Sequence, residues 1–298
     1  MKRGVIELPL HWIMVIIIGV ALLIFFGQAG WKLSDVSKDV NDRLLVLEFE
    51  KIFLNAASNT KTSSYVDLPL EDKVVEFKGD RFYIKEGSKL IASGKLNQFV
   101  FGNKIERERV RVWSETFELP FKVANFVYVD DGRGFEIVDY VGSLGSEVKN
   151  ELEDKGFNVN GEKRIKFVKG DNDCLDDSDA DLIVYYVEDE IIEDAIIYGT
   201  VCFYENGEKK GEKEFVTREM IYGAIFSNFE TYSELYDRAI ERLIDVDEIY
   251  ANIDDRCRVK IPFGEMNNLD DIVDIIKKAK EIEEKNKERI RSGCDYAY

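Results

Sequence analysis

The residues best suited to holding a metal ion are the carboxylates of one acidic segment, residues 171–181. Calcium takes about six to eight oxygen ligands, and carboxylates at alternating positions of a loop supply them. The segment lacks the central glycine and the final glutamate of an EF-hand, so a solvated acidic loop is the plain alternative. The sequence indicates calcium as the only candidate cofactor, with these ligands: Asp171, Asp173, Asp176, Asp177 and Asp179.

Residues for catalysis are scarce. The only histidine, His11, lies in an apolar N-terminal run, which argues against a Ser–His–Asp site, a Cys–His site and histidine-ligated zinc. The segment 142–146 (GSLGS) lacks both the dinucleotide-binding glycine pattern and the P-loop lysine, so an ordinary strand-to-helix turn is favoured. We predict no catalytic residue and no enzymatic activity. A carboxylate-dependent hydrolase is the alternative, because 59 acidic residues offer many carboxylate pairs.

The four cysteines show neither CxxC nor zinc-finger spacing. In an oxidising compartment they would form up to two disulfides. The sequence leaves three connectivities open. We favour the pairs that each fall within one predicted structural block, which are Cys174 with Cys202 and Cys257 with Cys294.

The element that must position the rest of the chain is the apolar run 8–29. A membrane helix needs about 20 mostly apolar residues, and positively charged flanks stay in the cytoplasm. Lys2 and Arg3 precede the run. The pattern therefore predicts residues 1–30 as a single-pass membrane anchor or signal, with the N-terminus cytoplasmic and the bulk of the chain extracellular.

The first residues also carry a short processing motif. Lys2-Arg3-Gly4, followed by Glu7 and the apolar run, resembles the class III signal of archaeal type IV pilin-like proteins. The resemblance covers about the first tenth of the chain. It implies cleavage after Gly4 and an apolar helix that is kept for assembly through these residues: Ile16, Ile17, Val20 and Leu23. Cleavage after Ala29 and an uncleaved signal anchor are the alternatives.

Beyond the run, the sequence predicts that the helix continues as an amphipathic stem within residues 31–64. Apolar residues recur mostly at three- and four-residue intervals up to about Ala57. They are Leu33, Val36, Val40, Leu44, Leu47 and Leu54. A stalk that packs on its own domain is the alternative to an assembly stem. Small polar residues over 55–64 predict a loop.

The remaining chain divides into two predicted domains, which makes the fold class α+β. Period-two alternation and glycine turns over residues 65–131 predict a small antiparallel β domain, with a hairpin turn at Gly79-Asp80. Apolar strands alternating with helical segments over 132–298 predict an α/β domain. Two long apolar-striped segments near the C-terminus predict a helical hairpin that ends this domain.

Charge limits the classes of partner. The formal net charge of −18 leaves no basic cluster in the linear sequence, which argues against nucleic acid. We therefore expect a membrane-anchored binding or structural protein with protein partners in the cell envelope. The pilin-like resemblance narrows this expectation to an accessory component of a surface filament or envelope complex.

Overall fold

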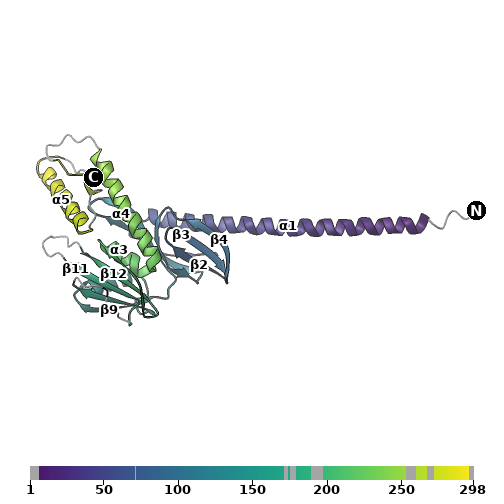
Figure 1. Cartoon of the computed structure of the whole chain (residues 1–298), viewed down its shortest axis with the longest axis horizontal. Helices are drawn as coiled ribbons and strands as arrows, with labels where there is room; N and C mark the ends of the chain where they lie inside the picture. The colour runs from purple at the N-terminus through teal and green to yellow at the C-terminus, as the bar shows by residue number, and fades with distance from the viewer. Residues whose placement is uncertain are drawn as a thin grey trace, which may run out of the picture. The chain divides into compact units, whose positions relative to one another are not determined.

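The computed structural model describes residues 7–70, 72–170, 174, 179–188, 197–252, 260–266 and 272–294; within these ranges the side chains of 7–17, 27, 29–42 and 139–141 are not described. The chain divides into two compact units, Met1–Glu48 and Phe49–Tyr298. Helix α1 (Glu7–Ser58) runs through the boundary between them (Figure 1). Pro9 falls in the first turn of α1, where proline is tolerated because that turn's N–H groups have no helical partner.

The structure contradicts the predicted membrane anchor. None of the helices, judged on the residues described, has an apolar stretch of the length that a bilayer crossing requires. The described side chains of Ile18–Phe26 in α1 are all apolar or glycine. The predicted single-pass topology is therefore corrected, and the cytoplasmic N-terminus and extracellular bulk lose the anchor from which they were inferred.

Two antiparallel-rich sheets come from the region predicted as β. One has the order β1-β7-β8-β5 and the other has the order β4-β3-β2-β6. Gly79, at a φ of +57°, forms the turn between β2 and β3, so the predicted hairpin is confirmed. The strands are β1 (Ser63–Asp67), β2 (Lys73–Lys78), β3 (Arg81–Glu86), β4 (Lys89–Lys95), β5 (Phe99–Phe101), β6 (Lys104–Ile105), β7 (Arg109–Glu118) and β8 (Lys122–Asp130).

The third sheet is mixed, with the order β13-β12-β11-β10-β9. Strand β10 pairs in parallel with both β9 and β11, and α2 packs against β9 and β10. The elements of this region are β9 (Phe135–Val141), α2 (Leu144–Asp154), β10 (Lys163–Lys169), β11 (Leu182–Glu188), β12 (Ile197–Glu205) and β13 (Glu208–Phe215). The GSLGS segment therefore joins a strand to a helix, as predicted for an ordinary turn.

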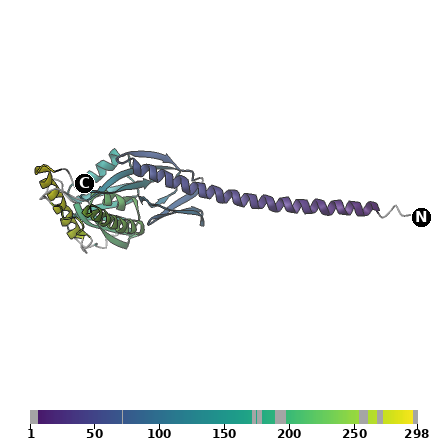
Figure 2. The ribbon, with the colours of Figure 1, turned by 90° about the horizontal axis from the view of Figure 1, so that it is seen from above.

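Helices α3 (Arg218–Phe226), α4 (Phe229–Ala251) and α5 (Ile272–Arg291) complete the fold. Asn228 separates the first two, because its side-chain oxygen accepts the Thr231 N–H at 2.9 Å and so begins α4. Helix α3 contacts β5, β7 and β8 on one side and β11, β12 and β13 on the other. Figures 1 and 2 show α3 and α4 among the sheets.

One hydrophobic core joins the two predicted domain ranges, 65–131 and 132–298. Trp113 and Tyr128 from β7 and β8 contact Tyr222 of α3, with ring centroids 4.9 Å and 5.9 Å from the Tyr222 ring. All three rings are almost fully buried. The aromatic contacts explain how α3 is fixed between sheets that come from different parts of the chain.

Candidate functional site

The predicted calcium ligands lie almost wholly outside the described residues. Asp171, Asp173, Asp176 and Asp177 are not described, and Asp179 lies in a turn before β11. Over the part of the chain that is described, no three His, Cys, Asp or Glu side chains are grouped to hold a metal ion. Calcium binding therefore stays a prediction.

The first predicted disulfide is present. Cys174 is bonded to Cys202 of β12, with Cα atoms 5.9 Å apart. Cys294 is also disulfide-bonded, and Cys257, its predicted partner, lies outside the described residues. The first bond ties Cys174, within the acidic segment, to the mixed sheet.

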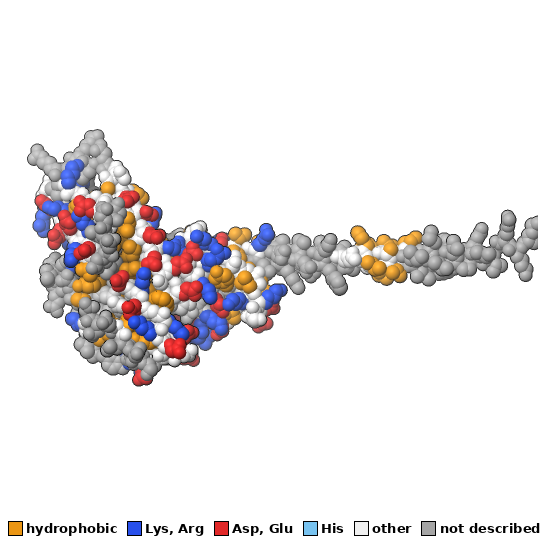
Figure 3. All heavy atoms as spheres, in the orientation of Figure 1, with side chains coloured by type: hydrophobic (Ala, Val, Ile, Leu, Met, Phe, Trp, Pro, Cys, Tyr) orange, Lys and Arg blue, Asp and Glu red, His pale blue; other side chains and the backbone are white. Residues whose placement is uncertain are grey.

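The predicted assembly residues lie on α1. Val20 and Leu23 are exposed, Leu23 by 74%, whereas the side chains of Ile16 and Ile17 lie outside the described residues. Every described side chain from Ile18 to Phe26 is exposed, and these side chains form a continuous apolar band in Figure 3. Of the two processing residues, Gly4 is not described and Glu7 begins α1.

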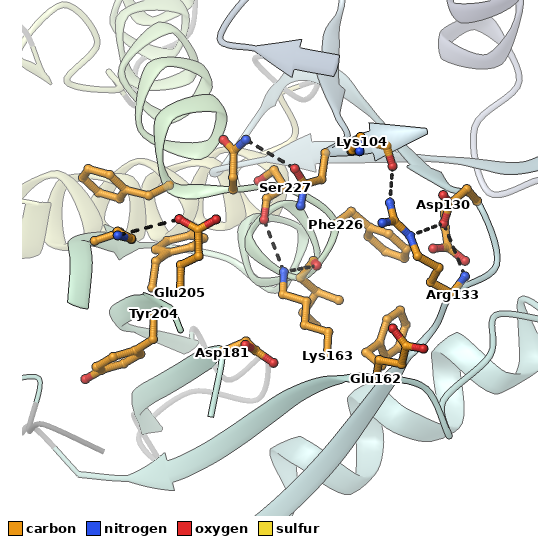
Figure 4. A pocket seen from close by; sticks show the side chains of 18 of the residues that line it. Lys104, Asp130, Arg133, Glu162, Lys163, Asp181, Tyr204, Glu205, Phe226 and Ser227 are labelled. Atoms are coloured by element: carbon orange, nitrogen blue, oxygen red, sulfur yellow. Dashed lines mark hydrogen bonds and ion pairs between the residues drawn. The ribbon is translucent and has the colours of Figure 1, made fainter. Parts of the chain in front are cut away.

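A cavity with a volume of about 770 Å³ lies in the second compact unit. Its lining comes from the β8–β9 turn, the first residues of β9 and β10, the end of β12 and the α3–α4 junction. Figure 4 shows the side chains converging on it from these elements. The parallel strands β9 and β10 thus begin at the cavity, whereas open α/β sheets more often bind ligands where such strands end.

Lys163, the first residue of β10, points across this cavity to the end of α3 (Figure 4). Its ammonium donates to the carbonyl oxygens of Ile225 at 2.6 Å, Ser227 at 3.2 Å and Ala224 at 3.4 Å. Burial lowers the pKa of the Lys163 ammonium to about 8, although the nearby carboxylate of Asp181 opposes the shift. All three N–H donors are used, so the chemistry of Lys163 is to close the C-terminal end of α3.

The other cations of the cavity also have protein partners. Arg133 Nε lies 2.9 Å from Asp131 Oδ1, and its guanidinium also donates to the Lys104 carbonyl. Lys104 is paired with Glu106, and Lys210 lies 3.7 Å from Glu205. These pairs leave no uncommitted cation among the described lining residues.

Asp130, the last residue of β8, has the most perturbed carboxyl group of the cavity. Burial raises the pKa of Asp130 to about 6, with a further contribution from the Asp131 carboxylate. Its Oδ2 accepts the Gly132 N–H at 3.0 Å, and the charges of Arg133 and Arg107 oppose the rise. A carboxyl group with this pKa exchanges protons near neutral pH.

Sequence reasoning missed this cavity. Its residues are separated by up to 127 positions, from Asn103 to Glu230, and no short motif links them. Lys163 carried one local signal, an alternating apolar strand that begins with a lysine. That signal could not show that the lysine meets the end of a helix some 60 residues later. Comparison of the chain with protein-family models, curated proteins and solved structures found no match.

Proposed function

We propose that the chain is a structural protein that assembles with copies of itself through α1. The observation that carries this proposal is the exposure of every described side chain from Ile18 to Phe26. A helix that is apolar on all sides is stable in water only when neighbours cover it. Several such helices, packed side by side, would cover one another.

A second copy of this chain is the occupant that best fits the segment. The segment contains no charge, hydrogen-bonding side chain or pocket that would select a different partner. The α1 helix of a second copy has an apolar segment of the same length, and that segment is apolar around its whole circumference. A filament-like bundle of this kind agrees with the resemblance of the N-terminal segment to pilin-like proteins.

The C-terminal half of α1 supports the proposal. Phe49 and Phe53 are fully buried, and Phe49 stacks on Phe82 of β3 with ring centroids 5.6 Å apart. Leu44, Leu47 and Leu54 are each more than half exposed. At 3.6 residues per turn these leucines share the face opposite the two phenylalanines. The described part of the predicted stripe is therefore open to a partner helix, and a different face supplies the contacts with the sheet.

The mass of the full chain in solution tests this proposal. Sedimentation equilibrium should give a defined multiple of 34.4 kDa for the wild type and a shift toward the monomer for Leu23→Glu. Leu90→Glu is the matched control, because Leu90 of β4 is also an exposed leucine, 52% exposed. A wild-type monomer at all concentrations, or an aggregate without fixed mass, would contradict the proposal. So would equal assembly of Leu23→Glu and wild type.

A carboxylate-dependent hydrolase is the second candidate function. The observation in its favour is Asp130, whose pKa is raised to about 6 by burial beside a cavity of about 770 Å³. A carboxylic acid with such a pKa suits the protonation of a leaving group. Incubation with a panel of chromogenic glycosides tests this candidate. Hydrolysis that is lost in Asp130→Asn and kept in Asp67→Asn would support it, and no turnover by the wild type would end it.

A further inference from the structure

A second cavity, with a volume of about 370 Å³, is lined by three arginines in a strongly acidic protein. Arg109 and Arg111 belong to β7, and Arg107 lies in the bend just before it. Alternate residues of a strand share a face, so the spacing directs these side chains to one side. We call this cavity the arginine pocket.

Tyr65 holds two of the guanidinium groups together. Tyr65 of β1 lies directly opposite Arg111 in the antiparallel ladder, and Arg109 is the next residue on that face. The guanidinium carbons of Arg111 and Arg109 lie 4.0 Å and 4.5 Å from the centroid of the Tyr65 ring. The aromatic ring stabilises two like charges near each other, which repel without it.

The arginines are anchored but not neutralised. Arg111 donates to the Lys155 carbonyl at 2.6 Å and to Ser63 Oγ at 3.2 Å, and Arg107 donates to the Asp131 carbonyl at 3.3 Å. Within the described part of the chain, neither arginine forms an ion pair with a carboxylate. Each guanidinium has five N–H donors, so most of its donors are free to meet an anion.

Arg109 is also weakly paired. Among the described residues it pairs with Asp67, whose Oδ1 lies 3.9 Å from Arg109 Nε, and both side chains are more than two-thirds exposed. Exposed pairs at such distances contribute little, about 0–1 kcal/mol. A ligand that enters the pocket therefore displaces no strong partner of Arg109.

The two carboxylates of the pocket do not cancel its charge. Asp131 is already held by Arg133 Nε at 2.9 Å and by the Glu106 N–H at 3.3 Å. Burial raises the pKa of Asp130, so this carboxyl group is protonated more readily than an ordinary one. The pocket therefore keeps an excess of positive charge.

We propose that the arginine pocket binds a small ligand through its phosphate group. A phosphate presents several oxygens in a compact group, and guanidinium forks bind such oxygens in pairs. Three guanidiniums that line one pocket, two from β7 and one from the bend before it, match this requirement. The cavity also extends along Phe157 and Asn158, which leaves room for an organic group attached to the phosphate.

Calorimetric titration of the full chain at low ionic strength tests the proposal, with inorganic phosphate and phenyl phosphate as probes. We expect saturable binding that Arg107→Gln and Arg109→Gln each weaken by about tenfold. Arg81→Gln is the matched control, because Arg81 is an exposed arginine of β3 in another sheet, and it should bind like the wild type. Arg111 is left intact because it also holds Ser63 and Lys155.

Tighter binding of phenyl phosphate than of inorganic phosphate would support a phosphate ester as the ligand. The reverse order would support the free anion. No saturable binding by the wild type would overturn the proposal. Equal affinities of the wild type, Arg107→Gln and Arg109→Gln would overturn it too, since binding would then lie elsewhere. The circular dichroism spectra of Arg107→Gln and Arg109→Gln should match that of the wild type, which would exclude misfolding.

Discussion

The segment Met220–Phe226 of α3 and the segment Ile18–Phe26 of α1 both lack charged residues, yet the first is buried and the second is exposed. In α3 every residue from Met220 to Phe226 is buried between sheets. In α1 every described side chain of Ile18–Phe26 is exposed. Apolar composition therefore makes both segments helical, but only the neighbouring sheets supply a cover for α3. In the assembly proposed above, neighbours from outside the chain would cover the segment of α1.

Because α3 is buried, the carbonyl groups at its C-terminal end need hydrogen-bond partners from the protein. The last carbonyl groups of a helix have no partner within it, and water cannot satisfy them in a buried site. Lys163 satisfies three such groups, and Ser227 Oγ donates to the Gly223 carbonyl at 2.5 Å. The buried end of α3 is thus satisfied by a lysine ammonium and a serine hydroxyl group that lie inside the protein.

The largest expected effect is on the packing of α3. Ile221 is fully buried, so Ile221→Ala leaves a cavity between the sheets. We expect the free energy of unfolding to fall by about 3 kcal/mol. Urea unfolding followed by circular dichroism measures it. A loss below about 1 kcal/mol would show that α3 is not enclosed as described.

A somewhat smaller loss is expected when the end of α3 loses its lysine. Lys163→Met removes three donors from buried carbonyls but also removes a buried charge, which partly offsets the loss. We expect a net decrease of about 2 kcal/mol in the free energy of unfolding. Lys122→Met is the control, because Lys122 of β8 is exposed and should change the value by less than about 0.5 kcal/mol. If Lys163→Met and Lys122→Met have equal free energies of unfolding, Lys163 does not stabilise the end of α3.

The cavity at the end of α3 should also give the protein a pH signature. Asp130 has a folded-state pKa of about 6 against an ordinary 3.8, so the folded state binds its proton more tightly than the unfolded state. Stability from this group is full below about pH 4 and is lost as the pH rises through about 6. The charged groups that affect Asp130 are Asp131, Arg133 and Arg107, and it in turn affects Lys163.

Asp130→Asn should therefore be more stable than the wild type at pH 7, by about 2 kcal/mol, and equal to it near pH 4. Urea unfolding at both pH values gives the comparison. Asp67→Asn, at a carboxylate that is 87% exposed, should show no such difference. An identical pH dependence of the wild type and Asp130→Asn would mean that Asp130 is not buried in solution.

The contrast between the two helices also explains what could be predicted from the sequence. Period-two runs and the Gly79-Asp80 turn predicted the strands, and the spacing of structural blocks led to the Cys174–Cys202 pair. These features depend on neighbouring residues or on one block of the chain. The spacing of Arg107, Arg109 and Arg111 is also compatible with one shared face, but the linear charge count concealed these arginines because Glu106 and Glu108 flank Arg107.

The features that could not be predicted depend on contacts between distant segments. Lys163 meets Ile225 across 62 positions, and the cavity of about 770 Å³ joins segments that lie far apart in the chain. The anchor was predicted from composition alone, and composition does not show which apolar helix has neighbours. For that reason Ile18–Phe26 and Met220–Phe226 are hard to tell apart before the fold is known.

The smallest expected effect is on the exposed apolar segment, and it separates folding from assembly. Leu23→Ala removes the same kind of side chain as Ile221→Ala, but from a site that is 74% exposed. At the lowest protein concentration the free energy of unfolding should change by less than about 0.5 kcal/mol. If copies pack through α1, the wild type should gain stability as concentration rises, because association favours the folded state, and Leu23→Ala should gain less. Urea titrations over a hundredfold range of concentration measure both quantities. If the free energy of unfolding of the wild type does not change with protein concentration, copies of the chain do not pack through α1, and the proposed assembly is wrong.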